Sequence, residues 1–137
     1  MNGDTEAVLA ANRAFYEAFE ARDLDAMSVV WEHTDRATCT HPGWTTLRGW
    51  GQVAASWYAL FQAAQRLQFI LTDERVDVAG DVAWVSLNEN ILGVEAGATV
   101  AAVNVFVRDD DGGPHRGEWR MVVHHASVVT DSSPTIQ

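Results

Sequence analysis

The sequence predicts an α+β domain in which three N-terminal helices pack into the concave face of a curved, mainly antiparallel sheet. Apolar residues recur at helical spacing through the first half of the chain. The second half carries four segments rich in valine, isoleucine, phenylalanine, tryptophan and threonine, which are separated by short connections containing glycine or aspartate. Helices followed by strands in this order favour an α+β arrangement.

Three helices are expected in the first half of the chain. The first spans residues 4–22, where Asp4 can cap its start and neither proline nor glycine interrupts it. Asp23 can cap a second, shorter helix. The third begins near Trp50 and keeps an apolar stripe as far as about Gln65.

One short strand and four longer strands are expected around and after the third helix. Ala37–Thr40 is expected to be the short strand, and it leads into the turn His41-Pro42-Gly43. The longer strands are expected at Gln68–Val78, Val82–Val94, Ala98–Arg108 and Glu118–Val129. The sequence shows no internal repeat or interdomain linker, so residues 1–137 are expected to form a single domain.

The composition argues against several classes of partner. Nine basic side chains against 19 acidic ones give a formal net charge of −10, which repels nucleic acid and anionic membranes. Cys39 is the single cysteine and the N-terminus does not resemble a signal peptide, so a cytoplasmic location is expected. The sequence has no phosphate-binding loop, dinucleotide fingerprint or clustered histidine motif, and we expect neither a cofactor nor a metal.

Several stretches in order resemble the SnoaL-like branch of the NTF2-like superfamily. They are FYEAFEARDLDAMSVVW, CTHPGW, LRGWGQVAASW, DVAWVSLNEN, VNVF and WRMVVHHAS, and the resemblance covers nearly the whole chain. It implies a cone-shaped domain with an apolar pocket between helices and sheet, which usually dimerises through the outer face of the sheet. The superfamily includes isomerases, dehydratases, polyketide cyclases, hydrolases and binding-only proteins, so the resemblance does not choose an activity.

Glu89 is a candidate acid or base because of its place in an alternating strand. One face of the strand carries Val85, Leu87, Glu89 and Ile91, and the other carries Trp84, Ser86, Asn88 and Asn90. The more apolar face should point inward, and this sends the Glu89 carboxylate toward the pocket, where burial raises its pKa unless it finds donors. The alternative is that Glu89 lies at the wet rim or pairs with an arginine.

The resemblance also implies roles for His41 and Asn104. In ketosteroid isomerase the aspartate that acts as general base precedes a proline after the first short strand, where this chain has His41. Histidine has an unperturbed pKa near 6.5 and could move a proton near neutral pH, or His41 could simply belong to the turn. With the register usual in the family, Asn104 lies beside Glu89, near the position of an aspartic acid that donates to the oxyanion. A structural bond between Asn104 and Glu89 is the alternative.

His124 and His125 are neighbours on the last strand, so they point to opposite faces. Alignment with the family implies that His124 points inward and His125 outward, and a core histidine bonded to Glu89 or to a carbonyl is the alternative for His124. A metal site formed by His41, Glu89 and His124 is a further geometric alternative. The sequence differs from ketosteroid isomerase at the position of the oxyanion-hole tyrosine, where this chain has Phe15. The next residue, Tyr16, is rotated by about 100 degrees around the helix axis, so its hydroxyl group should point away from the pocket.

Aromatic side chains are abundant enough to form a ligand-binding wall. The candidates for ligand contact are Phe15, Phe19, Trp44, Trp57 and Phe61, with Trp44 the first choice because it adjoins His41. They favour a small apolar or aromatic ligand, although most aromatic side chains in any domain form the core.

Two classes of function follow from these residues. The first is a cofactor-independent isomerase, cyclase or dehydratase that uses acid–base catalysis, with His41 or Glu89 as base and Asn104 and His124 as donors. The second is a noncatalytic ligand-binding or dimerisation module. A homodimer is expected in either case, because an outer sheet face carrying Trp84, Met121 and Val123 would otherwise be an exposed apolar patch.

Overall fold

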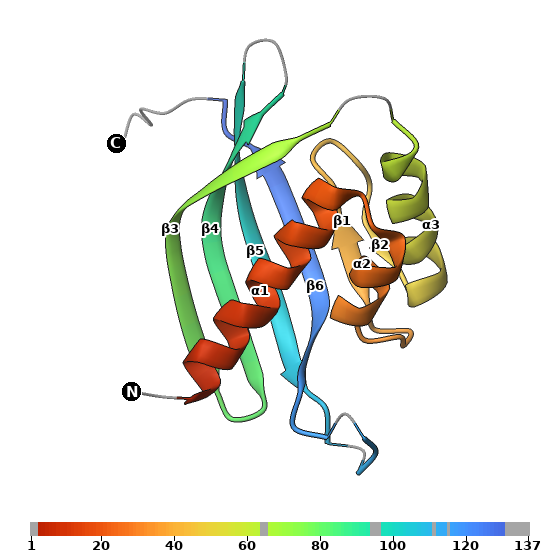
Figure 1. The fold of residues 1–137 in the computed structure, drawn as a ribbon, viewed down its shortest axis with the longest axis vertical. Coiled ribbons are helices and arrows are strands. Elements are labelled where there is room, and N and C mark those ends of the chain that lie inside the picture. The colour runs from red at the N-terminus through yellow and green to blue at the C-terminus, as the bar shows by residue number, and fades with distance from the viewer. Residues whose placement is uncertain (1–2, 64–65, 94–96, 111, 115, 131–137) are drawn as a thin grey trace.

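The computed structural model describes residues 3–63, 66–93, 97–110, 112–114 and 116–130. Within them, three helices cover one face of a single curved six-stranded sheet (Figure 1). The predicted α+β fold is therefore confirmed, including the order of helices before the long strands.

The helices are α1 (Gly3–Ala21), α2 (Leu24–Val30) and α3 (Trp50–Phe61). Asp23 caps α2 as predicted, because its side chain accepts a 3.0 Å hydrogen bond from the Ala26 amide. Asp4, the expected cap of α1, lies inside the first turn instead, and its carboxylate binds both terminal nitrogens of Arg108 at 3.0 and 2.8 Å. The helix α3 ends before Gln65, which lies outside the described residues.

The strands are β1 (Thr38–Thr40), β2 (Leu47–Arg48), β3 (Gln68–Ala79), β4 (Val82–Leu92), β5 (Ala98–Arg108) and β6 (Trp119–Val128). Their order in the sheet is β2-β1-β6-β5-β4-β3, and only the β1–β6 pair is parallel among the described strands. The two-residue strand β2 is not among the strands that the sequence predicts. The predicted end of β4 at Val94 lies outside the described residues.

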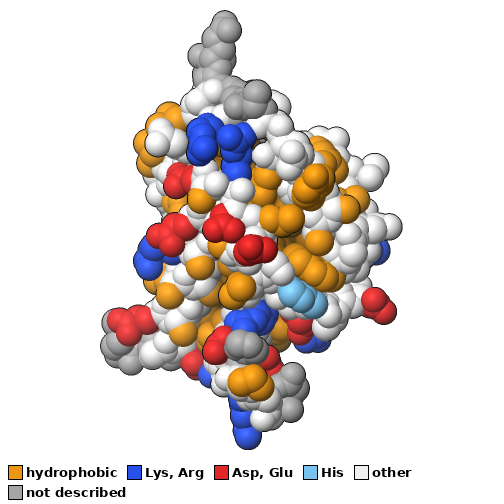
Figure 2. All heavy atoms as spheres, turned by 45° about the vertical axis from the view of Figure 1, so that its right-hand side comes forward, with side chains coloured by type: hydrophobic (Ala, Val, Ile, Leu, Met, Phe, Trp, Pro, Cys, Tyr) orange, Lys and Arg blue, Asp and Glu red, His pale blue; other side chains and the backbone are white. Residues whose placement is uncertain are grey.

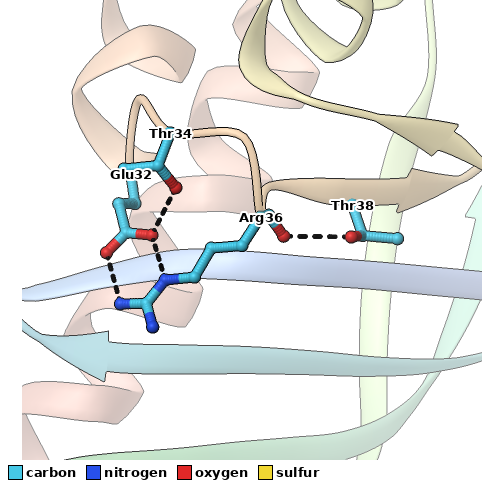
Figure 3. Close-up of polar contacts among 4 residues, drawn as sticks. All are labelled: Glu32, Thr34, Arg36 and Thr38. Carbon is cyan, nitrogen blue, oxygen red and sulfur yellow. Dashed lines mark hydrogen bonds and ion pairs between the residues drawn. The ribbon is translucent and has the colours of Figure 1, made fainter.

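The connection from α2 to β1 is held by its own side chains (Figure 3). Glu32 accepts two hydrogen bonds from the Arg36 guanidinium, at 2.7 and 2.8 Å, and a third from the Thr34 hydroxyl at 2.7 Å. Thr38 then donates to the Arg36 carbonyl at 3.0 Å. These contacts fix where β1 begins, and β1 in turn delivers His41 to the interior.

A β-bulge in β6 changes which residues face the core. Val105 pairs with Val123, whereas the next residue of β5, Phe106, pairs with Met121, so Val122 is the extra residue. Met121 and Val122 are both buried as a result. The prediction that Met121 lies on the outer face is therefore wrong, because strict alternation does not hold across a bulge.

The core lies between α1, α3 and the inner face of the sheet (Figure 1). Its fully buried large side chains include Phe15, Met27, Trp31, Val53, Trp57 and Phe106. Burying one such side chain stabilises the fold by roughly 1.5–3 kcal/mol. Within the described part of the chain, none of the helices has the length and apolar character needed to cross a membrane.

Candidate functional site

A cavity of about 280 Å³ opens at one end of the cone, and several of the predicted site residues line it. Its walls are mostly apolar, from Phe19, Trp44, Leu60, Phe61, Phe69 and Ile91. Among the lining residues, three side chains carry ionisable groups, namely Arg22, His41 and Glu89. A mostly apolar hollow with a few polar groups is typical of a small-molecule site, and this volume is near the lower end of the usual range of roughly 300–1,000 Å³.

Glu89 lies in the cavity as the alternation of β4 predicts. Val85, Leu87 and Glu89 are all buried, and only 2% of Glu89 is exposed. Its Oε2 atom accepts a 2.5 Å hydrogen bond from the Tyr16 hydroxyl. Burial raises the pKa of Glu89 to about 7, while the bond from Tyr16 acts in the opposite direction. The carboxyl group can therefore exchange a proton near neutral pH.

Tyr16 is the residue that the sequence reasoning misjudged. Its hydroxyl points into the interior, where it donates to Glu89 and accepts a 3.1 Å hydrogen bond from Asn104 Nδ2. The prediction of a misdirected phenol is wrong, because α1 buries both Phe15 and Tyr16. Burial and the neighbouring Glu89 raise the pKa of Tyr16 far above its usual value, so the phenol remains a donor.

Asn104 is fully buried on β5, but the register differs from the predicted one. Asn104 pairs with Val85, whereas Glu89 pairs with Val100, so the two polar residues are not cross-strand neighbours. Tyr16 joins them instead, because its hydroxyl contacts both side chains. The predicted direct bond from Asn104 to Glu89 is replaced by this bridged contact.

His124 points inward and His125 is exposed on the outer face, which confirms the predicted alternation at these positions. The His124 Nδ1 atom lies 2.6 Å from Asn104 Oδ1. Burial, followed by the nearby His41 and His125, lowers the pKa of His124 to about 3, so its imidazole is neutral at neutral pH. It packs beside Phe15 in the core rather than among the residues that line the cavity.

His41 lines the cavity and is held by a closed turn. The Trp44 amide donates to the His41 carbonyl at 2.9 Å, and Gly43 takes the positive φ of +82° that the third position of a type II turn requires. The Ser56 hydroxyl donates to the Val53 carbonyl at 2.7 Å, so its oxygen accepts from His41 Nε2 at 2.9 Å. Burial lowers the pKa of His41 to about 4, which makes it a neutral and weak base at pH 7.

The predicted ligand-contact residues divide into two groups. Phe19, Trp44 and Phe61 line the cavity, and Trp44 meets His41 edge-to-face at 4.9 Å. Phe15 and Trp57 are fully buried in the core, where their ring centroids lie 5.5 Å apart. They support the cavity wall from behind.

A further buried polar residue, Asn12, was not predicted. It is fully buried on α1, accepts from Asn104 Nδ2 at 2.8 Å and donates to Glu74 Oε2 at 3.0 Å. Its sequence signal is the spacing to Val8 and Tyr16, four residues away on either side, which places an amide in the apolar stripe of α1.

A larger cleft of about 650 Å³ lies between the α2–β1 connection and the ends of β5 and β6. Its three arginines are held in ion pairs, Arg36 with Glu32, Arg108 with Asp4 and Arg120 with Glu118. Acidic and basic side chains also lie side by side on the face drawn in Figure 2. We therefore place the candidate site in the smaller cavity. Among the described residues, no three His, Cys, Asp or Glu side chains come together as a metal site, and this includes the alternative at His41, Glu89 and His124.

Known proteins share this fold and part of this sequence. Residues 8–131 match the family model described as a SnoaL-like domain. The crystal structure of a proposed dehydratase of the NTF2-like family from Streptomyces avermitilis is 38% identical, with a TM-score of 0.83 over 93% of this chain and 97% of that one. A proposed calcium/calmodulin-dependent protein kinase type II association domain from Thiobacillus denitrificans is also 38% identical, with a TM-score of 0.73 over 88% and 94%.

A curated relative shows that the domain also occurs in a longer protein. The F-box protein SKIP8 of Arabidopsis thaliana is 31% identical over 125 residues, which cover 91% of this chain and 51% of that protein. The chain thus spans about half the length of the curated relative it matches.

Proposed function

Because the chain belongs to the SnoaL-like domain family, we propose that it binds a small apolar or cyclic ligand and catalyses an isomerisation, cyclisation or dehydration without a cofactor. One observation carries this proposal: a buried carboxyl group with a pKa of about 7, that of Glu89, lies in the wall of an apolar cavity. The 38% identity to a proposed dehydratase supports the same class of chemistry. The domain would act as one unit over residues 1–137.

The proposed reaction begins when Glu89 removes a proton from a ligand carbon. In an isomerisation, the same carboxyl group returns that proton to another carbon, so the ligand's formula is unchanged. In a dehydration, the electron pair expels a hydroxyl group, which leaves as water with the abstracted proton. Tyr16 holds the carboxylate through its hydrogen bond, and Trp44 and Phe61 supply apolar surface for the ligand.

His41 takes a secondary role in this proposal. Its Nε2 hydrogen is already given to Ser56, and its lowered pKa makes it a weaker base than Glu89. It therefore contributes a polar contact at the cavity wall.

His124 and Asn104 do not line the cavity, and both amide hydrogens of Asn104 are bound to Asn12 and Tyr16. In this proposal the two residues therefore support Tyr16 instead of donating directly to a ligand, which is the role that the sequence predicts for them.

The catalytic proposal can be tested with an enolisable bicyclic ketone, 2-tetralone, in deuterated buffer. We expect the protein to accelerate exchange of the acidic C–H protons, followed by NMR, by about 10²–10⁴-fold through general-base catalysis. Glu89→Gln should return the rate to that of buffer, whereas Glu17→Gln, an exposed change on α1, should not. If a panel of such ketones binds but none exchanges faster than in buffer, the catalytic proposal fails.

A noncatalytic association module is the second candidate, and the outer face of the sheet favours it. The strand register places Trp84, Val105 and Val123 side by side across β4, β5 and β6. Trp84 is 38% exposed and Val103, further along β5, is 40% exposed. We propose that a second copy of the chain covers this apolar row, in line with the 38% identity to a proposed association domain. A monomer at micromolar concentration in sedimentation would contradict this.

The proposed location is the cytoplasm. It is supported by the single cysteine, Cys39, which is buried and free. Fractionation of cells that express the full-length protein would test this.

A further inference from the structure

A continuous chain of side-chain hydrogen bonds runs from the edge of the sheet to the candidate site. It starts at Glu74, an exposed residue at a bulge in β3, where the pairing shifts between Thr72 and Arg75 and Asp73 takes a positive φ of +59°. Asn12 Nδ2 donates to Glu74 Oε2 at 3.0 Å, although Asn12 itself is fully buried. The bulge therefore brings one strand-edge carboxylate to a buried amide.

The direction of each hydrogen bond follows from this carboxylate. A carboxylate only accepts, so Asn12 must turn its NH₂ group toward Glu74 and its oxygen toward Asn104. Asn104 then uses its two amide hydrogens on Asn12 Oδ1, at 2.8 Å, and on Tyr16 Oη, at 3.1 Å. Because Tyr16 accepts there, its own hydrogen is free for Glu89.

The same logic fixes the tautomer of His124. Asn104 presents its Oδ1 atom to His124 Nδ1 at 2.6 Å, so the histidine must carry its hydrogen on Nδ1. The reverse arrangement would satisfy the contacts among Asn12, Asn104 and His124 equally well. It would satisfy the contact between Tyr16 and Glu89 only when the Glu89 carboxyl group is protonated and donates to the Tyr16 oxygen. Asn12 and Asn104 would both turn over, Tyr16 would donate to Asn104, and His124 would carry its hydrogen on Nε2.

We propose that Glu74 is a positioning residue for the candidate site. Through Asn12 and Asn104, its carboxylate keeps the Tyr16 hydroxyl donating its hydrogen bond to Glu89. It also keeps the His124 imidazole in the tautomer that carries its hydrogen on Nδ1. This inference deepens the proposed function, because it rests on Glu89 as the group that transfers the proton. The hydrogen-bond direction can nevertheless be measured without any substrate. Glu74 is not among the residues that line the candidate cavity, and it acts only through this chain of amides.

The decisive change is Glu74→Lys, because an ammonium group only donates and therefore demands the reverse direction. Asp77→Lys is the matched control, since it makes the same charge change on β3 but lies next to Arg75, outside the chain of hydrogen bonds. Glu74→Ala, which removes the acceptor without adding a donor, serves as a second variant. Glu74 is exposed and the Asp77 side chain is 35% exposed, so the fold should tolerate both changes.

The first readout is the ¹⁵N spectrum of the imidazoles, with the His124 signals assigned by their loss in His124→Gln. We expect a single Nδ1–H tautomer in the wild type and in Asp77→Lys, the Nε2–H tautomer in Glu74→Lys, and both tautomers in Glu74→Ala. A wild-type tautomer in Glu74→Lys would overturn the proposal.

The second readout is the titration of Glu89 by ¹³C NMR, assigned by its loss in Glu89→Gln. Losing the Tyr16 hydrogen bond should raise the pKa of Glu89 in Glu74→Lys by about one unit above its value in Asp77→Lys. The other ionisable groups that line the cavity, Arg22 and His41, belong to other elements and are unchanged in both variants.

The two proposals fail separately. If Glu89 titrates at its ordinary value in the wild type, the proposed function loses its support, while the His124 tautomer still tests the role of Glu74. If the pKa of Glu89 is raised in the wild type but neither readout differs between Glu74→Lys and Asp77→Lys, the proposed function stands and Glu74 has no positioning role.

Discussion

Replacing Glu89 by glutamine should make the protein more stable above neutral pH. Glutamine keeps the shape of the side chain and an oxygen that can accept from Tyr16, but it has no proton to lose. A freely solvated glutamate side chain has a pKa of 4.5, and burial raises the pKa of Glu89 to about 7 in the folded protein. The folded state therefore resists ionisation that the unfolded chain undergoes freely.

The sign and size of the effect follow from this difference. Below pH 4.5 the group is protonated in both states and costs nothing. Between pH 4.5 and 7 the unfolded chain releases its proton first, so the free energy of unfolding falls as the pH rises. Above pH 7 the loss is complete and amounts to about 3 kcal/mol, since each pKa unit corresponds to about 1.4 kcal/mol. Because only 2% of Glu89 is exposed, solvent screening reduces this little.

Urea unfolding at pH 5, 6, 7 and 8.5 would measure the effect. The gain in free energy of unfolding from Glu89→Gln, relative to wild type, should grow with pH and level off above about 7. Glu17→Gln on the exposed face of α1 is the control for a simple change of net charge. A Glu89→Gln difference that is constant across this range would refute the reasoning, because it would mean that Glu89 titrates alike in both states.

Three further outcomes are expected. Trp44→Ala should weaken binding of an apolar dye such as anilinonaphthalene sulfonate, because Trp44 lines the cavity. It should change the free energy of unfolding by less than about 0.5 kcal/mol, because Trp44 is 43% exposed. As the control, Tyr58→Ala should leave dye fluorescence unchanged, since Tyr58 is 57% exposed on α3 and does not line the cavity. His124→Leu should lower the free energy of unfolding by about 1–3 kcal/mol at pH 7, because it leaves the Asn104 oxygen unpaired. This difference should shrink toward pH 5, where the wild type loses stability because its buried imidazole stays neutral while the unfolded chain takes up a proton. Urea titrations at the two pH values would measure it. Trp84→Glu should shift the sedimenting species from dimer to monomer, and a dimer that persists would place the interface elsewhere.

Glu89 could be predicted from the sequence, whereas Tyr16 could not. More exposed and buried residues alternate along β4 from Val82 to Asn90, and this alternation is enough to decide that the Glu89 carboxylate faces inward. A helix gives a weaker signal, because α1 lies in the hollow of the sheet and buries more than one row of side chains. Phe15 and Tyr16 point in directions about 100 degrees apart, yet both are buried.

β-Bulges account for most of the side-chain placements that the sequence did not predict. The extra residue at Val122 turns Met121 into the core, and the bulge after Thr72 brings Glu74 to Asn12. Nothing in the local composition marks either position, because a bulge depends on how two strands must curve to stay paired over a helix. The turn at His41 is different, since the proline and glycine that follow His41 predict it directly.

The opposite effects of burial on Glu89 and His41 lead to a last prediction, the shape of the pH–rate profile. Burial disfavours the charged form of each group, so it raises the pKa of Glu89 to about 7 and lowers that of His41 to about 4. Near neutral pH the cavity thus holds one titrating acid beside a neutral imidazole.

If Glu89 is the base, kcat/KM should rise with pH through a single inflection near 7 and then stay level. A bell-shaped profile would need an acid that titrates just above neutral pH, and Tyr16, whose pKa is raised far above its usual value, cannot supply it. Such a profile would show that the proton donor comes from the ligand or from a partner subunit.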